Sequence, residues 1–158
     1  MQTFLPYKDF ESSARVLDDK RLGKQRVETM QIMHALVKLQ VKTDTAVVPW
    51  GNHPVTKMWR GHENMLMEYQ DAICDEWDRR GFNDTCRAKT LNMFRLFPSS
   101  IATAESPYWL GLKLLHSTHR ANLLRKDPEW YGQWGWKEEP QEGYWYPPMN
   151  VIQNLSRA

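Results

Sequence analysis

Cysteine is scarce in this chain of 158 residues, which contains only Cys74 and Cys86. Two cysteines provide neither a disulfide scaffold nor a four-cysteine zinc site. The sequence also lacks an apolar run near the ~18 residues that span a bilayer, and its first ten residues lack the pattern of a secretory signal. These absences predict a cytoplasmic protein with no membrane partner.

Several motifs of cofactor and metal chemistry are missing as well. The glycines at positions 132 and 135 are separated by aromatic residues, so they do not form a phosphate-binding loop. The nucleophile elbow of serine hydrolases is absent. His116 and His119 have a three-residue spacing that a metal pair could use, but no cysteine neighbours them. We therefore expect neither a metal ion nor an organic cofactor.

The net charge of +2 is small, but it is unevenly distributed. The tail from Asp127 onward holds five acidic and two basic residues, so the first 126 residues carry 19 basic and 14 acidic residues. This asymmetry favours a polyanionic partner, because local clusters of charge create an electrostatic footprint. The chain also contains eight tryptophans.

Apolar residues recur at steps of three and four, and no stretch alternates with a period of two, so the sequence predicts an all-α fold. We expect a compact single domain with about three main helices, over residues 9–39, 54–79 and 106–126. Gly23 and the acidic pair Asp18-Asp19 are expected to break the first into two pieces, and residues 82–105 are expected to form an apolar plug under a loop. Cys74 lies on the apolar stripe of the second region and is predicted to be a core residue. An aromatic-rich segment follows at residues 130–136, which divides the chain into a domain over 1–136 and an extension over 137–158.

The first helical region carries a polar stripe, made of Asp18, Arg21, Gln25 and Glu28. Steps of three and four place these residues on one helical face. Such a stripe is either a solvated face with ordinary salt bridges or the wall of a cleft, where a carboxylate beside arginines can perform acid–base chemistry. His53 directly precedes a helix start at Pro54, where we expect it to cap the helix or to be buried with its hydrogen bonds satisfied.

Basic residues cluster once in each helical region. If the clusters converge beside the aromatic segment, cations would bind phosphates while rings stack on an unpaired base. The clusters comprise Lys20, Arg21, Lys24 and Arg26; Arg79, Arg80, Arg87 and Lys89; and Lys113, Arg120, Arg125 and Lys126.

Five motifs together resemble the pyrimidine-dimer DNA glycosylase (endonuclease V) family of phages and bacteria. The resemblance extends from residue 1 to about 136, and it is specific in the order and spacing of the motifs. They are LDDKRLGKQRVE at 17–28, NHP at 52–54, MWRGHE at 58–63, EWDRRGF at 76–82 and HRANLLRKDPEWYG at 119–132.

The resemblance implies a compact all-α protein that binds damaged or modified double-stranded DNA as a monomer, in a bacterial nucleoid or a phage-infected cell. It implies base flipping, attack of the terminal α-amine on the deoxyribose, a Schiff base, and strand cleavage by β-elimination. The α-amines of peptides titrate near pH 8, so a fraction of them is neutral and nucleophilic at pH 7, unlike lysine.

The resemblance also assigns roles to residues. Met1 would supply the amine, because Gln2 is too large to favour removal of the methionine. An ungapped alignment places Gly23 where the family has its catalytic glutamate, so the candidate carboxylates are Asp18, Asp19 and Glu28, with Arg21 and Gln25 beside them. The candidate DNA contacts are Lys20, Lys24, Arg26, His53, Arg60, Arg120, Arg125, Lys126, Trp130 and Tyr131.

Three other functions fit the same sequence. The scaffold could flip a pyrimidine and modify it without cleaving the strand. It could be a non-catalytic DNA-binding protein that reads DNA with its polar stripe, in which case binding is salt-dependent and no covalent intermediate forms. It could also be an all-α interaction domain in which the tryptophans are simply core residues.

Overall fold

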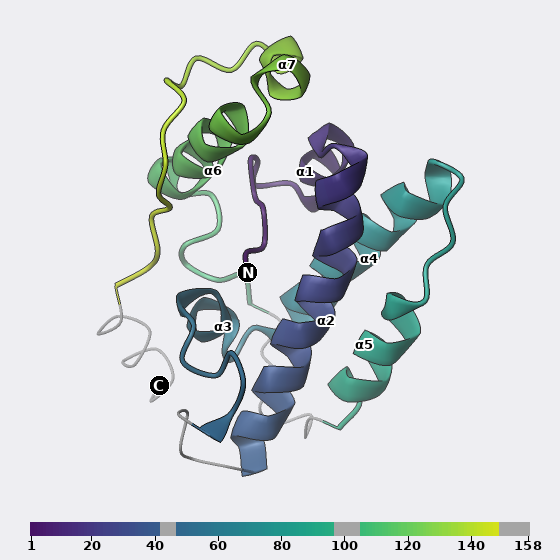
Figure 1. Ribbon diagram of the computed structural model, residues 1–158. Helices are drawn as coiled ribbons and strands as arrows, with labels where there is room; N and C mark the ends of the chain where they lie inside the picture. Colours follow the sequence, from purple (N-terminus) through teal and green to yellow (C-terminus); the bar gives the residue numbers. More distant parts are fainter. Residues whose placement is uncertain (42–46, 97–104, 149–158) are drawn as a thin grey trace.

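The computed structural model describes residues 1–41, 47–96 and 105–148, and these residues contain helices and no strand, so the all-α class is confirmed. Helix α2 runs along the middle of the molecule, with α4 and α5 packed against it (Figure 1). The α-helices are α1 (Phe10–Val16), α2 (Asp19–Val41), α3 (Pro54–Trp59), α4 (Glu63–Arg79), α5 (Cys86–Phe94), α6 (Lys113–Lys126) and α7 (Pro128–Tyr131), and the 3₁₀ helix η2 covers Gly132–Trp134.

Asp18 divides the first predicted helix into α1 and α2. Leu17 is extended, with ψ at 139°, and the carbonyl of Asp18 accepts the amide of Leu22 at 2.8 Å. The carboxylate of Asp18 also lies 3.4 Å from the amide of Arg21, as at a helix start. The expected break at the acidic pair is thus confirmed, whereas Gly23 lies inside α2.

Two glycines shorten the other predicted helices. Gly61 has a φ of +87°, which separates α3 from α4. Gly111 has a φ of +100°, so Pro107 begins only a single turn and α6 starts at Lys113. The region expected to be an irregular plug contains α5, whose polar Thr90 is buried and accepts a hydrogen bond from Gln70 at 2.9 Å. The structure therefore corrects the expectation of about three helices to a larger number of shorter ones.

The first residues of the chain pass through the core in an extended conformation, between α2 and α6 (Figure 1). Gln2, Thr3, Phe4 and Leu5 are all buried. They have no strand partner, so side chains must satisfy their backbone groups. The amide of Phe4 donates to Gln25 Oε1 at 2.9 Å, and the amide of Leu5 donates to His119 Nδ1 at 2.9 Å.

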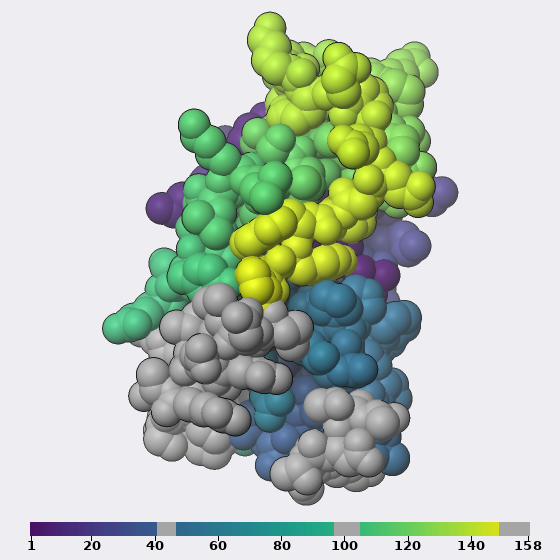
Figure 2. All heavy atoms as spheres, turned by 90° about the vertical axis from the view of Figure 1, so that its left-hand side faces the viewer, coloured from purple at the N-terminus to yellow at the C-terminus, as the bar shows by residue number. Residues whose placement is uncertain are grey.

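Part of the predicted extension lies against the helical core. Residues 137–148 run over α6 towards α3 (Figure 2). Arg120 Nε lies 2.8 Å from Glu138, and the amide of Gln141 donates to the carbonyl of Ala121 at 3.2 Å. The amide of Trp145 donates to Thr118 Oγ1 at 3.1 Å. Residues 137–148 are therefore packed on the folded domain, while the division of the chain at residue 136 stays a prediction.

Both cysteines are free and buried, which confirms Cys74 as a core residue. Burial raises the pKa of the Cys74 thiol, and the negative charge of Asp84 raises it further. No helix in the described parts of the chain is long and apolar enough to cross a membrane.

The buried histidine of α6 predicts a pH dependence of stability. Burial, with a contribution from the positive charge of His116, lowers the pKa of His119 to about 3 from its ordinary value of 6.5. Between pH 3 and 6.5, His119 is therefore protonated in the unfolded chain and neutral in the folded chain. The free energy of unfolding falls as the pH falls below 6.5. Urea unfolding at pH 7 and pH 5 should show that His119 contributes about 2 kcal/mol to the loss.

The control is His119→Asn, which keeps an acceptor near the amide of Leu5 and does not titrate. The variant should lose less stability between the two pH values than the wild type. Equal losses in both proteins would contradict the assignment.

Candidate active site

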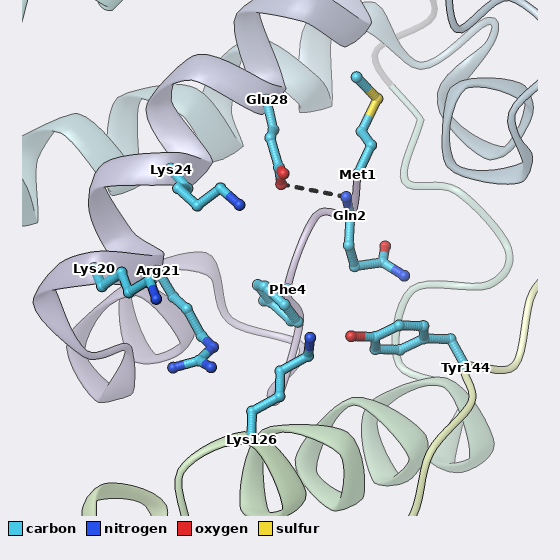
Figure 3. Close-up of a pocket in the computed structure, with 9 residues that line it drawn as sticks. All are labelled: Met1, Gln2, Phe4, Lys20, Arg21, Lys24, Glu28, Lys126 and Tyr144. Carbon is cyan, nitrogen blue, oxygen red and sulfur yellow. Dashed lines mark hydrogen bonds between the residues drawn. The ribbon is translucent and has the colours of Figure 1, made fainter.

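A cavity of about 370 Å³ opens where the N-terminal residues meet α2, α6 and the C-terminal segment (Figure 3). The chain end itself forms part of the lining. The cavity is lined by Met1, Gln2, Phe4, Lys20, Arg21, Lys24, Glu28, Lys126 and Tyr144. Four segments of the chain thus converge at one site.

The lining is strongly cationic. Lys20, Arg21 and Lys24 come from α2, and Lys126 comes from the end of α6. Partial burial lowers the pKa of Lys126, as do the positive charges of Arg21, Arg125 and Lys24. A cavity with this charge attracts an anionic ligand such as a phosphate.

Glu28 is the one carboxylate among the lining residues. Its Oε2 accepts the amide of Gln2 at 3.3 Å (Figure 3). The same oxygen accepts the side-chain amide of Gln25 at 3.1 Å. These contacts hold the carboxylate directly beside the first peptide unit of the chain. A carboxylate is thereby held next to the terminal residue, in a cavity that four cationic side chains also line.

Gln25 connects the helix to the N-terminal segment. Its Nε2 donates to the carbonyl of Gln2 at 2.8 Å, while its Oε1 accepts the amide of Phe4 and lies 2.6 Å from the hydroxyl of Tyr69. Gln25 is fully buried and is not among the residues that line the cavity. Its contacts are those of a residue that positions Met1 and Glu28.

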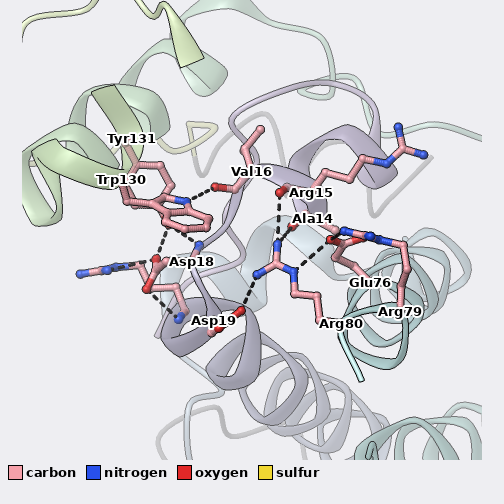
Figure 4. Close-up of polar contacts among 11 residues, drawn as sticks. Ala14, Arg15, Val16, Asp18, Asp19, Glu76, Arg79, Arg80, Trp130 and Tyr131 are labelled. Carbon is pink, nitrogen blue, oxygen red and sulfur yellow. Dashed lines mark hydrogen bonds and ion pairs between the residues drawn. The ribbon is translucent and has the colours of Figure 1, made fainter. Parts of the chain in front are cut away.

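Asp18 and Asp19 lie away from the cavity lining, around the junction of α1 and α2 (Figure 4). Asp18 accepts hydrogen bonds from the hydroxyl of Tyr131 and from Arg21 Nη1. Burial alone would raise the pKa of Asp18, but these two hydrogen bonds outweigh it and lower the pKa. Asp19 pairs with Arg80 at 2.9 Å. Both carboxylates are therefore engaged in holding helices together.

Gly23, which the resemblance aligns with the family's glutamate, lies on the face of α2 that packs against Trp77 of α4. A Cβ at Gly23 would lie 3.0 Å from the ring of Trp77. Trp77 stacks on Phe82 and donates from Nε1 to the carbonyl of Asn83 at 3.1 Å. A side chain at position 23 would therefore press on a fixed ring instead of entering the cavity. The same face carries Arg26, whose guanidinium lies 4.3 Å from the centre of the Trp77 ring.

Arg26 and Arg120 both form salt bridges with carboxylates of the protein. Arg26 Nη1 pairs with Asp84 at 2.8 Å, and Arg120 pairs with Glu138 at 2.8 Å while donating to the carbonyl of Pro6 at 2.7 Å. Neither lines the cavity. Arg125 is exposed next to Lys126, with one contact to Asn122 at 3.2 Å.

The two predicted stacking residues are packed against the protein. Tyr131 is fully buried and stacks on Trp136, with ring centres 5.7 Å apart. Trp130 donates from Nε1 to the carbonyl of Val16 at 2.7 Å (Figure 4). Tyr131 is therefore inaccessible to a base in this structure.

His53 caps α3 as expected, since its Nδ1 accepts the amide of Val55 at 3.1 Å. Burial lowers the pKa of His53, and so does the positive charge of the terminal amine. His53 is thus close to the chain end, although it does not line the cavity. Arg60 is exposed at the end of α3.

The histidine pair of α6 binds backbone. His116 Nε2 accepts the amide of Gly111 at 2.9 Å, and its Nδ1 lies 2.8 Å from the carbonyl of Leu5. His119 accepts the amide of Leu5. Within residues 1–41, 47–96 and 105–148 no group of His, Cys, Asp and Glu side chains could hold a metal ion.

Sequence reasoning missed the two aromatic residues of the cavity, Phe4 and Tyr144. Tyr144 lies in the Tyr144–Tyr146 stretch, which shows no helical periodicity. Phe4 belongs to a segment too short to show a pattern. Neither residue belongs to the helical patterns that identified the polar stripe.

The fold and the cavity define an all-α protein that presents cations and one carboxylate around its N-terminal residue. The family model for pyrimidine dimer DNA glycosylases matches residues 1–90, which is more than half of the chain. The chain therefore belongs to the pyrimidine dimer DNA glycosylase family. Membership implies DNA glycosylase activity, with DNA as the substrate.

The matched range contains Met1, Arg21 and Glu28, whereas Lys126 and Tyr144 lie outside it. The similarity seen at residues 119–132 also lies outside the matched range and stays a prediction. No curated protein and no solved structure matches the chain significantly.

The contact between Gly23 and Trp77 predicts the effect of placing the family's glutamate in this register. Gly23→Glu should lower the free energy of unfolding by about 1–3 kcal/mol through overpacking, even though replacing glycine inside a helix is by itself favourable by up to about 1 kcal/mol. Urea unfolding of the variant measures the change.

Val27→Glu is the matched control, because Val27 is an exposed residue of the same helix. Its effect should stay within about 0.5 kcal/mol. A Gly23→Glu variant as stable as this control would show that position 23 has room for a side chain.

Proposed function

We propose that this protein is a DNA glycosylase with abasic-site lyase activity, which acts on a damaged or modified pyrimidine in duplex DNA. The observation that carries the proposal is the shared cavity of Met1 and Glu28, which four cationic side chains also line. It combines an amine, a carboxylate and a phosphate-binding surface at one place. No metal ion or organic cofactor is required by this chemistry.

The α-amine of Met1 is the proposed nucleophile. Its nitrogen lone pair attacks C1′ of the deoxyribose, the bond from C1′ to the pyrimidine breaks, and the base departs with a proton. The sugar ring then opens: the C1′–O4′ bond breaks, O4′ takes a proton, and the nitrogen lone pair forms a C1′=N double bond. The resulting iminium ion makes the C2′ protons acidic. Removal of one C2′ proton forms a double bond between C2′ and C3′, and the C3′–O bond breaks with departure of the phosphate.

Glu28 is the proposed acid–base and electrostatic group. A carboxylate beside C1′ stabilises the positive charge that develops on the sugar as the base departs. The same carboxylate is placed to accept a proton of the attacking amine, because it already holds the amide of Gln2. Gln25 acts as a positioning residue, since it donates to Glu28 and to the carbonyl of Gln2.

The cations are proposed to bind the DNA backbone around the flipped nucleotide. Lys20, Arg21, Lys24 and Lys126 line the cavity, and Arg125 is exposed beside Lys126. Phosphate contacts of this kind position the duplex without reading its sequence. We leave Arg26 and Arg120 out of this surface, because neither lines the cavity and each is paired with a carboxylate on another segment.

Borohydride trapping on DNA tests the proposal. The protein, with Met1 as its free N-terminus, is mixed with a duplex that carries one abasic site, reduced, and digested for mass spectrometry. We expect a covalent adduct on the α-amine of Met1, because reduction fixes the imine. A protein with two residues added before Met1 is the control and should give no adduct. An adduct on Lys126, or tight duplex binding with no adduct, would overturn the proposed mechanism.

Glu28→Gln tests the role of the carboxylate. The glutamine keeps an oxygen that can accept the amide of Gln2, but it has no charge and accepts no proton. We expect the rate of trapping and of strand cleavage to fall about 10²- to 10⁴-fold, with little change in thermal unfolding. Single-turnover kinetics on abasic DNA measure the rate.

Asp19→Asn is the matched control. Asp19 is a carboxylate of the same helix, but it pairs with Arg80 outside the cavity. It should retain most of the wild-type rate. A larger loss of rate in Asp19→Asn than in Glu28→Gln would show that Glu28 is not the acid–base carboxylate.

A further inference from the structure

Tyr144 and Lys126 together form the side of the cavity that neither the N-terminal segment nor α2 provides. The ring of Tyr144 contacts Phe4 and His119, with ring centres 6.2 Å and 5.1 Å away. These contacts support the ring, and the phenol points into the cavity, towards Phe4 and the amino group of Lys126 (Figure 3). The backbone on either side is tied to α6 through Gln141 and Trp145. Tyr144 is therefore held in place before any ligand binds.

The hydroxyl of Tyr144 has no hydrogen bond to any residue that the structure describes. Other tyrosine hydroxyls near the N-terminal segment have one: that of Tyr146 accepts Gln2 Nε2 at 3.0 Å, and that of Tyr69 lies 2.8 Å from the carbonyl of Phe4. The hydroxyl of Tyr144 is thus exposed in the cavity, with its hydrogen-bonding capacity unused by the described residues. The partner of Tyr144 is therefore expected to come from the occupant of the cavity.

The chemistry of the phenol selects the kind of atom that it binds. Burial raises the pKa of Tyr144, and the neighbouring Tyr146 raises it further, so the hydroxyl stays neutral and donates. The cations of the cavity suit phosphate oxygens, whereas a neutral donor suits a neutral acceptor. Pyrimidines present such acceptors in their carbonyl oxygens. The ring of Phe4, against which Tyr144 packs, adds an apolar surface for a base.

We propose that Tyr144 determines specificity by donating a hydrogen bond from its hydroxyl to a carbonyl oxygen of the pyrimidine that enters the cavity. This inference rests on the proposed glycosylase function and adds to it the residue that reads the base. Tyr144 lies beyond residues 1–90, so the base is read by a part of the chain that the family model does not match.

Tyr144→Phe tests the inference, because it removes only the hydroxyl. Two probes are used: a duplex with one cyclobutane thymine dimer, which retains the pyrimidine carbonyls, and the same duplex with one abasic site. Single-turnover rates are measured on the dimer, and borohydride trapping rates on the abasic site. We expect the loss on the dimer to exceed the loss on the abasic site about tenfold, the effect of one neutral hydrogen bond.

Tyr108→Phe is the matched control, since Tyr108 is exposed and does not line the cavity. It should leave both rates as in the wild type. Thermal unfolding of both variants checks the fold, and Tyr144→Leu, which also removes the ring, should lose at least as much on the dimer as Tyr144→Phe.

Each other outcome overturns the inference in a recognisable way. Equal losses of rate on both probes would show that Tyr144 contacts the sugar or phosphate that both probes contain. No loss on either probe would show that the hydroxyl makes no hydrogen bond that contributes to the reaction. A wild type that traps abasic DNA but leaves the dimer intact would show that the dimer's carbonyls are not bound in the cavity, which overturns the inference while leaving the lyase chemistry in place. A wild type that fails to trap abasic DNA would instead refute the proposed function itself.

Discussion

The structure depends on one constraint: an extended chain end is buried in a helical protein, and its peptide groups have no strand to pair with. A buried peptide group without a partner costs free energy comparable to a lost hydrogen bond. Gln25 provides the main solution, because its amide binds the carbonyl of Gln2 and the amide of Phe4 on either side of Thr3. His119 binds the next amide, that of Leu5. A terminus that usually frays is thereby made part of the core.

This burial determines where the first residue lies. Met1 lines the cavity because the four residues after it are buried, and Glu28 lies beside it because Gln25 is placed one helical turn away on the same face. Cations from α2 and α6 surround the pair. The site therefore does not need a loop to bring its groups together. It follows from the packing of two helices against one extended segment.

The helical periodicity of the sequence predicted the central part of this site. Steps of three and four placed Arg21, Gln25 and Glu28 on one face, and the structure brings that face to the N-terminal segment. Asp18 departs from the stripe because the helix breaks there and its carboxylate is bound by Tyr131 and Arg21. Chain spacing alone does not show whether a polar residue caps a helix or faces a cavity.

Other features depend on contacts between distant residues and could not be predicted from spacing. The breaks at Gly61 and Gly111 follow from positive φ angles in sequences that otherwise continue a helical pattern. The accessibility of an aromatic residue is equally non-local: Tyr131 looked available for stacking but is buried under Trp136. Tyr144 lies in a segment without periodicity and becomes part of the site only because that segment packs along α6.

Amide hydrogen exchange of the N-terminal segment tests the central claim most directly. If the chain end is a buried part of the core, the amides of Phe4 and Leu5 should exchange as slowly as those inside α4, because both donate to buried side chains. Exchange at the rate of an unstructured peptide would contradict the account. It would show that the first residues are free at the surface, and that Met1 is not held at the cavity.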